Sequence, residues 1–406
     1  MKPKILIVGG GMITHDQILP SVFQMQRNGV VGEITVCAQH GRTVKALAEA
    51  GAILRAFPGQ SFKAYPDPAS AEPQPELYKE LIARMPPRNI VIVAAPDQLH
   101  YDAVMTALRH NQHVCCVKPL VHKAEQSIEI EREAYARGLV VGIEYHKRFD
   151  DRSFRARRLY REGFLGEFQL GTARLMEKWY YRNSNFMNWC TKEHSDAFTY
   201  IGCHYVDLVH YISGLLPTSV SNYGILDTYP NGREGYLWCD TRVKWANGAA
   251  LNVQTTLCYP DEAPGPNTQG MTLYTRGATN AGLLDHSDQY RGLAYSMVKK
   301  PDAAGATFYA EPSPDYFQYN HLGGPGMQVV GYGYRSVEFI LRQCIEIEQV
   351  ADKQARLKEL DAAGVLATPA NSRYNELVME AGRLSILNGG REVAIEYGEN
   401  PSVRFA

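Results

Sequence analysis

The N-terminal stretch of the chain carries glycines at a spacing that suits phosphate binding. An apolar run from Ile5 to Val8 leads directly into Gly9, Gly10 and Gly11. Glycines at the first and third of these positions let the backbone turn sharply and approach a pyrophosphate, and the helix that follows would direct its N–H groups at the anion. The turn therefore predicts a dinucleotide site. Its predicted members are Gly9, Gly11, Met12 and Ile13.

Thr14 stands where the G-x-G-x-x-G pattern has its third glycine, so the motif is incomplete. A buried strand followed by an ordinary glycine turn would give the same letters. The context favours the nucleotide interpretation, because the strand opens the chain and an amphipathic helix with Ile18, Leu19 and Val22 follows the turn.

Polar residues also follow two later strand-like runs. Residues 89–94 lead into Pro96, Asp97 and His100, and residues 113–117 lead into Lys118 and Pro119. The carboxyl ends of parallel strands meet at one edge of a sheet, which is where such sheets bind ligands. Pro119 disfavours helical backbone at Lys118 and holds it extended at that edge. A lone Lys-Pro is usually a surface loop, but two such turns downstream of the glycine turn predict a shared site.

The end of the second predicted strand, residues 33–37, bears on the choice of cofactor. It reads Ala38-Gln39-His40-Gly41-Arg42 and lacks the acidic residue that binds the adenosine ribose and repels a 2′-phosphate. Arg42 could bind the phosphate of NADP, and Gln39 could bind the ribose of NAD through neutral hydrogen bonds. Both cofactors stay possible on this pattern.

A helix predicted over residues 196–213, and ended by Gly214, places three polar residues on one face. Tyr200 and His204 are four residues apart, and His204 and Asp207 are three apart. A histidine in such a helix is more often a core or surface residue than a catalyst. The helix by itself leaves the role of His204 open.

Composition narrows the class of protein. The 406 residues suffice for two domains, and a net charge of -1 gives no attraction to nucleic acid or anionic membrane. No apolar run approaches the roughly 20 residues of a membrane helix, and the first four residues lead into a strand rather than a secretory signal, so we expect a cytoplasmic protein. The eight cysteines include no C-x-x-C pair, which predicts buried thiols and no metal site.

The elements that must position these residues predict an α/β protein with two domains. Strands alternate with helices up to about residue 147, which predicts a Rossmann dinucleotide-binding domain over 1–147. Later runs are longer and sheet-like, and Asn247-Gly248 between two β-rich runs predicts a hairpin. We therefore predict an α+β domain on a large open mixed or antiparallel sheet over 148–406. The Pro- and Gly-rich stretches 260–267 and 301–325 read as lids, subunit arms or site rims.

Five motifs in order resemble those of the glucose-fructose oxidoreductase and inositol dehydrogenase family, called Gfo/Idh/MocA. The resemblance covers most of the sequence. The family's first turn corresponds to residues 9–13, its T-P-N-x-x-H turn to 95–100, its E-K-P turn to 117–119, its G-x-x-x-R-F segment to 142–149 and its G-x-H-x-x-D helix start to 202–207. It implies an NAD(P)-dependent oxidoreductase that acts on a secondary alcohol of a sugar, glycoside or inositol, as a homodimer or homotetramer. Family habit gives a slight preference for NAD.

The resemblance also implies roles for individual residues. Lys118 would orient the substrate hydroxyl, and His204 would be the general base in oxidation and the acid in reduction. Asp207 would bind a substrate hydroxyl or orient His204, and Tyr200 would offer a hydroxyl where the family has a carboxylate. The implied cofactor-binding residues are Gly9, Gly11, Met12, Ile13, Gln39, Arg42, Pro96, Asp97, His100 and Lys118, and the implied substrate-binding residues are His146, Arg148 and Asp207.

The chain departs from the family pattern at several positions. Val117 replaces the acid of E-K-P, Tyr200 replaces the aspartate four residues before the histidine, and the ribose acid is absent. Cofactor binding tolerates these changes better than the usual proton relay does. Two alternatives therefore stay open: an NAD-dependent enzyme that cleaves glycosides by transient oxidation and elimination, and a catalytically inactive nucleotide-binding regulatory protein.

Overall fold

The structure is a computed structural model that describes residues 2–263, 267–287, 294–297, 307–310 and 316–406. The chain packs as two compact units, and each is described by itself. Unit 1 contains Met1–Val121, Glu125–Phe149 and Phe317–Arg373, and unit 2 contains His122–Ala124, Asp150–Tyr316 and Tyr374–Ala406. The domain boundary between residues 147 and 148 stays a prediction. The packing adds that a late segment, 317–373, folds back onto the first unit.

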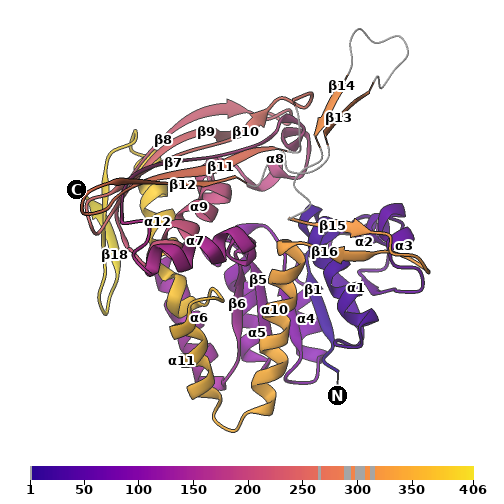
Figure 1. Ribbon diagram of the computed structural model, residues 1–406. Coiled ribbons are helices and arrows are strands. Elements are labelled where there is room, and N and C mark those ends of the chain that lie inside the picture. Colours follow the sequence, from indigo (N-terminus) through magenta and orange to yellow (C-terminus); the bar gives the residue numbers. More distant parts are fainter. Residues whose placement is uncertain (1, 264–266, 288–293, 298–306, 311–315) are drawn as a thin grey trace. The chain divides into compact units, whose positions relative to one another are not determined.

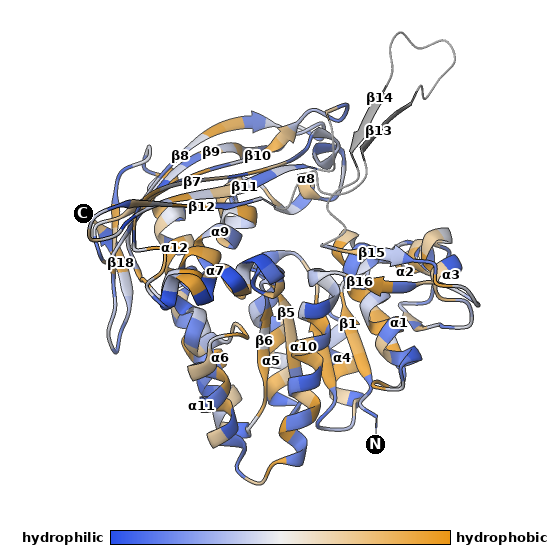
Figure 2. Ribbon diagram, viewed as in Figure 1, coloured by the Kyte–Doolittle hydropathy of each residue, from blue (hydrophilic) through white to orange (hydrophobic). Residues whose placement is uncertain are grey.

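Unit 1 is built on a six-stranded parallel sheet in the order β3-β2-β1-β4-β5-β6, which confirms the predicted Rossmann architecture. Every residue of β1, β4, β5 and β6 is buried, because helices cover both faces, and Figure 2 shows these strands as mainly hydrophobic. Chain order reverses between β1 and β4, and open α/β sheets bind their ligands at such a point. The strands are β1 (Ile5–Val8), β2 (Ile34–Cys37), β3 (Lys63–Tyr65), β4 (Ile90–Val93), β5 (His113–Val117) and β6 (Val141–Glu144).

Helices of three kinds surround this sheet. The glycine turn leads into a π-helical turn, η1, that continues as α1, so the predicted first helix is confirmed. The elements are η1 (Thr14–Ile18), α1 (Leu19–Arg27), α2 (Gly41–Ala48), α3 (Gly51–Ala56), α4 (Leu77–Arg84), η2 (Asp97–Leu99), α5 (His100–Arg109), α6 (Ala124–Arg137), η3 (His146–Phe149), α10 (Tyr332–Glu346), η6 (Ile347–Gln349) and α11 (Lys353–Ala363), with a hairpin of β15 (Gln318–Asn320) and β16 (Gln328–Val330).

Helix α10 belongs to unit 1 because its apolar stripe completes the core of the parallel sheet. Val337, Ile340 and Leu341 are fully buried in the same cluster as Ile5 and Ile7 of β1. A Cβ atom added at Gly142 of β6 would lie 2.6 Å from Ile340 Cγ2. Glycine at this position therefore lets α10 lie close against the sheet.

A hydrogen bond from a buried histidine holds the end of this late segment to the sheet. His113, fully buried at the start of β5, lies with Nε2 3.1 Å from Glu348 Oε1, while its Nδ1 accepts a hydrogen bond from the Val140 N–H at 3.1 Å. His113 therefore donates from Nε2. Lys353 Nζ lies 3.1 Å from the same carboxylate. The hydrogen bond from His113, with help from Lys353, lowers the pKa of Glu348 from 4.5 to about 2.

Replacing Glu348 by glutamine should lower the free energy of unfolding by about 1–2 kcal/mol at pH 7, a figure reduced for partial exposure of the carboxylate. The folded-state pKa is depressed, so the contribution is fully present above about pH 4.5 and is lost as the pH falls through about 2. Urea unfolding of both proteins between pH 7 and pH 3 measures it. The difference in unfolding free energy should narrow on acidification, and a difference that does not change with pH would contradict a role for the ionised Glu348 carboxylate.

Unit 2 is built on an eight-stranded sheet in the order β12-β11-β7-β10-β9-β8-β17-β18. Only β7 and β10 pair in parallel among these strands, so the predicted mixed sheet is confirmed. The predicted hairpin at Asn247-Gly248 joins β9 and β10, and Gly248 has the positive φ of +85° that the turn requires. The strands are β7 (Glu167–Lys178), β8 (Pro217–Thr228), β9 (Glu234–Trp245), β10 (Ala250–Tyr259), β11 (Asn267–Arg276), β12 (Ala281–His286), β17 (Val393–Glu396) and β18 (Ser402–Phe405), besides the separate pair β13 (Ala294–Met297) and β14 (Thr307–Ala310).

Helices cover one face of the eight-stranded sheet, as Figure 1 shows for α9 and α12. Asn222 of β8 donates to the Gly382 carbonyl of α12, which ties that helix to the sheet. Gly214 ends α9 in the left-handed conformation, as predicted from its position. The elements are α7 (Asp151–Arg161), η4 (Trp179–Asn183), α8 (Phe186–Trp189), η5 (Phe198–Gly202), α9 (Cys203–Ser213) and α12 (Pro369–Ile386).

Three further expectations concern the whole chain. All eight cysteines lie in the described ranges and each is a buried thiol, which confirms that part of the prediction. None of the helices in those ranges combines the length and the apolar character that a membrane crossing demands. The predicted insertions 260–267 and 301–325 lie partly outside the described residues.

Candidate active site

The glycine turn after β1 has the geometry of a phosphate cradle. Gly9 has φ +115°, and a Cβ atom at this position would lie 2.0 Å from the Ala94 carbonyl oxygen at the end of β4. Only glycine allows this close approach of the two strand ends. A Cβ atom at Gly11 would meet nothing within 4 Å, and Gly11 and Met12 are exposed while Ile13 is half-buried. The turn thus leaves open space beside its backbone at the start of a helix, which fits a dinucleotide pyrophosphate.

Thr14 has a structural role in place of the missing third glycine. Its side chain is fully buried, and its hydroxyl donates a hydrogen bond to the Gly9 carbonyl oxygen at 2.8 Å. The bond closes the turn from within. The departure from the glycine pattern is therefore compatible with the same turn geometry.

Gln39 and Arg42 are both exposed beside the end of β2. The Gln39 carbonyl accepts a hydrogen bond from the Gln74 N–H at 2.8 Å, which fixes its backbone. Arg42 is the second residue of α2. Both side chains are exposed near the end of β2, and their cofactor roles stay predictions.

His100 braces two turns at the carboxyl edge of the sheet. It is fully buried, with Nδ1 2.7 Å from the Pro119 carbonyl oxygen and Nε2 2.9 Å from the Ala95 carbonyl oxygen. The ring therefore links the turn after β4 to the turn after β5. This position favours a supporting role over the direct cofactor contact that the resemblance implied. Pro96, half-buried, and Asp97, buried, lie in the first of the two turns, and their roles stay predictions.

Lys118 lies in the second of these turns. It directly follows β5, is half-buried, and is joined to Pro119 by a cis peptide bond. Because His100 contacts the Pro119 carbonyl, the position of Lys118 depends on the turn after β4. The structure thus brings the glycine turn, residues 96–100 and Lys118 to one edge of one sheet.

The turn after β6 contains a carboxylate that sequence reasoning missed. Five residues separate Gly142 from Arg148, two more than the family motif has. Glu144, at the end of β6, is 2% exposed and lies 3.2 Å through Oε2 from His146 Nδ1. Arg148 is also buried, with its guanidinium 5.8 Å from the centre of the Tyr145 ring. An acidic residue that ends an otherwise apolar strand is the signal that could have found it.

In unit 2, the predicted helix is confirmed as the π-helical turn η5 followed by α9, and the shared face of its three polar residues stays a prediction. His204 and Asp207 are buried in α9, and Tyr200 lies one turn earlier in η5. The Tyr374 hydroxyl donates to Asp207 Oδ1 at 2.8 Å, so one oxygen of this carboxylate is held by α12. That bond fixes the orientation of Asp207.

Tyr200 belongs to an aromatic cluster, and its role in proton transfer stays a prediction. Its ring centre lies 4.8 Å from that of Phe186 and 5.6 Å from that of Trp189, both from α8. Tyr181 stacks on Phe186 at 5.3 Å, and burial raises the pKa of the Tyr181 phenol. The surroundings of Tyr200, which replaces the aspartate of the family motif, are therefore neutral and aromatic.

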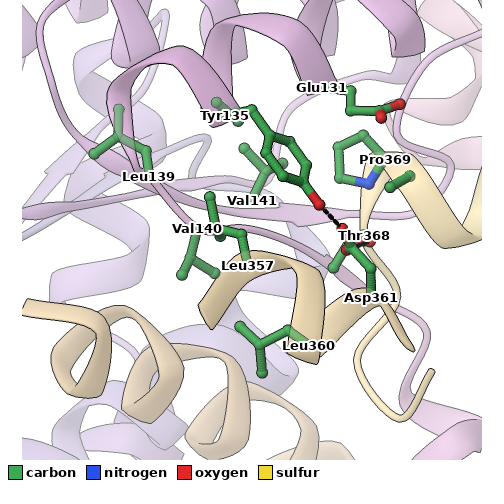
Figure 3. A pocket seen from close by; sticks show the side chains of 12 residues that line it. Glu131, Tyr135, Leu139, Val140, Val141, Leu357, Leu360, Asp361, Thr368 and Pro369 are labelled. Atoms are coloured by element: carbon green, nitrogen blue, oxygen red, sulfur yellow. Dashed lines mark hydrogen bonds between the residues drawn. The ribbon is translucent and has the colours of Figure 1, made fainter. Parts of the chain in front are cut away.

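A small pocket in unit 1 lies at the opposite end of β6 (Figure 3). Val140, Val141 and Leu357 line it between α6 and α11. Its polar groups satisfy one another, because Tyr135 and Thr368 both donate to Asp361, whose pKa burial raises. It lies at the amino end of β6, away from the edge that holds Lys118, and we treat it as a packing defect of unit 1.

Comparisons with known proteins agree with this arrangement. Residues 3–145 match the family model described as oxidoreductase family, NAD-binding Rossmann fold, and residues 154–276 match the one described as GFO/IDH/MocA C-terminal domain. The scyllo-inositol 2-dehydrogenase (NADP(+)) IolW of Bacillus subtilis (strain 168) is 27% identical over 157 residues, which are 37% of this chain and 42% of that protein. The 2,7-anhydro-N-acetylneuraminate hydratase of Escherichia coli (strain K12) is 28% identical over 136 residues, 34% of this chain and 36% of that protein.

Among solved structures, GenD2 from gentamicin A biosynthesis, in complex with NAD, has a TM-score of 0.66 at 16% identity and covers 98% of this chain and 97% of that one. This likeness shows the fold. The aligned segments span less than half the length of either curated relative.

Proposed function

Because the chain belongs to the Gfo/Idh/MocA oxidoreductase family, whose domain models match residues 3–145 and 154–276, we propose that it transfers a hydride between NAD or NADP and a secondary hydroxyl of a sugar, glycoside or inositol. The observation that supports this most is the turn at Gly9, where only glycine fits, beside the open space at Gly11. That opening lies at the switch point of a parallel sheet and suits a dinucleotide.

In the proposed reaction each residue has a separate task. The cofactor supplies the hydride chemistry when bound. His204 accepts the proton of the hydroxyl during oxidation and returns it during reduction, and Lys118 stabilises negative charge that develops on the reacting oxygen. Asp207, oriented by Tyr374, binds a neighbouring hydroxyl or orients His204. Tyr200 contributes a hydroxyl and an aromatic face.

We extend the proposal to a cytoplasmic homodimer or homotetramer that acts on small carbohydrates or polyols, without nucleic-acid or membrane partners. Leu170, Tyr274 and Leu283 support self-association, since they are exposed and are neighbours on three adjacent strands of the large sheet. A net charge of -1 supports the absence of a polyanionic partner.

A second candidate is cleavage by transient oxidation and elimination. Two observations favour it: one relative is named a hydratase rather than a dehydrogenase, and Val117 and Tyr200 replace the usual acids. In that case the cofactor would be regenerated in each cycle. Release of free aglycone without a net change in NADH absorbance would distinguish it.

One experiment tests these functions together. Mass spectrometry of whatever copurifies with the protein should find NAD or NADP, and a panel of sugars, inositols and glycosides read at 340 nm should find turnover. Tight cofactor binding with neither turnover nor aglycone release across the panel would instead support a regulatory nucleotide-binding protein.

Replacing Arg42 by alanine should reduce catalytic efficiency with NADP by roughly 1–2 kcal/mol and leave NAD almost unaffected, because the guanidinium would lose a charge-assisted bond to the 2′-phosphate. Steady-state kinetics with both cofactors measure it. Lys45→Ala, which removes an exposed cation from the same helix α2, is the matched control. Equal losses of catalytic efficiency with both cofactors, or no loss with either, would show that Arg42 does not bind the 2′-phosphate of NADP.

A further inference from the structure

Glu144 is held from two directions at the end of β6. The Gln17 side chain, from η1, donates to Oε1 at 2.8 Å, and the Ser336 hydroxyl, from α10, donates to the same oxygen. The second N–H of Gln17 donates to the Gly333 carbonyl at 2.9 Å, so the amide is fixed in this orientation. The other oxygen, Oε2, faces His146 Nδ1 at 3.2 Å. The two oxygens of the carboxylate therefore have different partners: Oε1 accepts from Gln17 and Ser336, and Oε2 faces His146.

Glu144 lies close to the position of a carboxylate that the family motif has and this chain lacks. Val117 occupies the acidic position of the E-K-P turn, and Val117 and Glu144 are register partners in the parallel pair of β5 and β6. Side chains of register partners point to the same face of a sheet and lie about 5 Å apart. Glu144 thus places a carboxylate on the same face and at the same level as Val117, on the strand beside β5, which leads into Lys118.

The contact with Glu144 selects the tautomer of a neutral His146 ring. A carboxylate oxygen accepts hydrogen bonds, so the ring nitrogen that faces Oε2 is the one that carries the hydrogen. Neutral His146 then carries its hydrogen on Nδ1 and has an acceptor lone pair on Nε2. The ring stacks on Tyr332 with centres 5.7 Å apart, which restricts its rotation. Its side chain is 13% exposed, so the ring reaches the surface of unit 1.

We propose that Glu144 is a positioning residue that replaces the missing acid of the E-K-P turn and holds His146 as a hydrogen-bond acceptor for a hydroxyl of the substrate. The inference rests on the proposed function and assigns to His146 a second hydroxyl of the polyol, besides the one that reacts. A deoxy or O-methylated analogue at that hydroxyl cannot donate, and His146 discriminates against it.

Glu144→Gln should exchange the donor and acceptor nitrogens of the His146 ring, because glutamine keeps the shape of glutamate but presents an NH2 group in place of one oxygen. Gln17 and Ser336 both donate toward Oε1, so the amide oxygen takes that place and the amide NH2 faces His146 Nδ1. The ring must then accept at Nδ1 and carry its hydrogen on Nε2. Proton-detected ¹H–¹⁵N NMR of ¹⁵N-histidine-labelled protein, at a pH where imidazoles are neutral, should show His146 as the Nδ1–H tautomer in wild type and as the Nε2–H tautomer in the variant. The signal is assigned by its loss in His146→Gln.

Ser336→Ala is the matched control, because it removes a donor to Oε1 and leaves the charged Oε2 facing His146. This variant should keep the wild-type tautomer. An Nε2–H tautomer in wild type, or no change in Glu144→Gln, would overturn the inference. A change to the Nε2–H tautomer in Ser336→Ala would also overturn it, because the change would then follow from the loss of any hydrogen bond to Glu144.

Kinetics test the substrate part of the inference. Glu144→Gln should raise KM for a polyol substrate roughly 10-fold with a smaller change in kcat, since the lost bond orients substrate in both ground and transition state. The penalty should disappear for the analogue that lacks the second hydroxyl. An unchanged KM in an active enzyme would overturn the recognition role. The NMR result needs no turnover, so inactivity of the wild type on every polyol would count against the proposed function alone.

Discussion

Replacing His204 by alanine should lower turnover by about 10²- to 10⁴-fold while cofactor affinity stays nearly unchanged. The side chain is buried in α9 of unit 2, whereas the residues assigned to the cofactor lie in unit 1. Alanine suits a helix and needs no new hydrogen bond, so the change removes the proton carrier with little effect on the backbone. Stopped-flow or steady-state kinetics together with cofactor titration measure the two quantities separately.

The effect of His204→Ala is best interpreted by comparison with a variant of a residue that has a different role. Lys118→Ala should impair both cofactor placement and rate, because Lys118 lies in a turn at the cofactor edge of the parallel sheet. Unfolding temperatures of both variants establish that the fold persists. Unchanged turnover in a folded His204→Ala protein would remove His204 from the mechanism.

The parallel sheet can be predicted because its strands are buried on both faces and therefore appear as continuous apolar runs. These runs predict β1 and β5 at the correct residues, and β4 within one residue at each end. β3 escapes prediction, since its three residues are largely exposed and form no apolar run. The packing of segment 317–373 in unit 1 cannot be predicted either. The stripe of α10 would bury equally well against either sheet, and only long-range packing decides between them.

The candidate site is predictable where a motif depends on backbone geometry, and less so where it depends on a side chain. Gly9 is recognisable because a glycine directly after a buried strand usually marks backbone that no other residue can adopt. The motif assigns His100 to the cofactor, yet its two ring nitrogens face backbone carbonyls, a contact between turns that no local pattern can reveal. Glu144 escapes notice because its partners, Gln17 and Ser336, lie 127 and 192 residues away in the chain.

Replacing Gly9 by alanine should lower the free energy of unfolding by about 3–5 kcal/mol and abolish cofactor binding. Two penalties add: the backbone has φ +115°, which a side chain disfavours, and the new Cβ would lie 2.0 Å from the Ala94 carbonyl oxygen. That neighbour is backbone at the end of a fully buried strand, so it cannot move aside as a flexible side chain would. We expect the unfolding temperature of unit 1 to fall by roughly 10 °C. Calorimetry, with fluorescence titration of NAD and NADP, measures both effects.

Gly11→Ala is the matched control, because the same added methyl group there meets no protein atom within 4 Å. Its unfolding temperature should stay within about 2 °C of wild type, since neither strain nor overlap arises. Cofactor affinity should nevertheless fall roughly 10-fold or more, because the methyl group occupies the space in which a pyrophosphate would approach the backbone. The two variants thus distinguish Gly9, which is needed to form the turn, from Gly11, which is needed for the pyrophosphate to bind there. Normal affinity for both dinucleotides in Gly11→Ala would place the pyrophosphate elsewhere and would remove the main support for a dinucleotide at this turn.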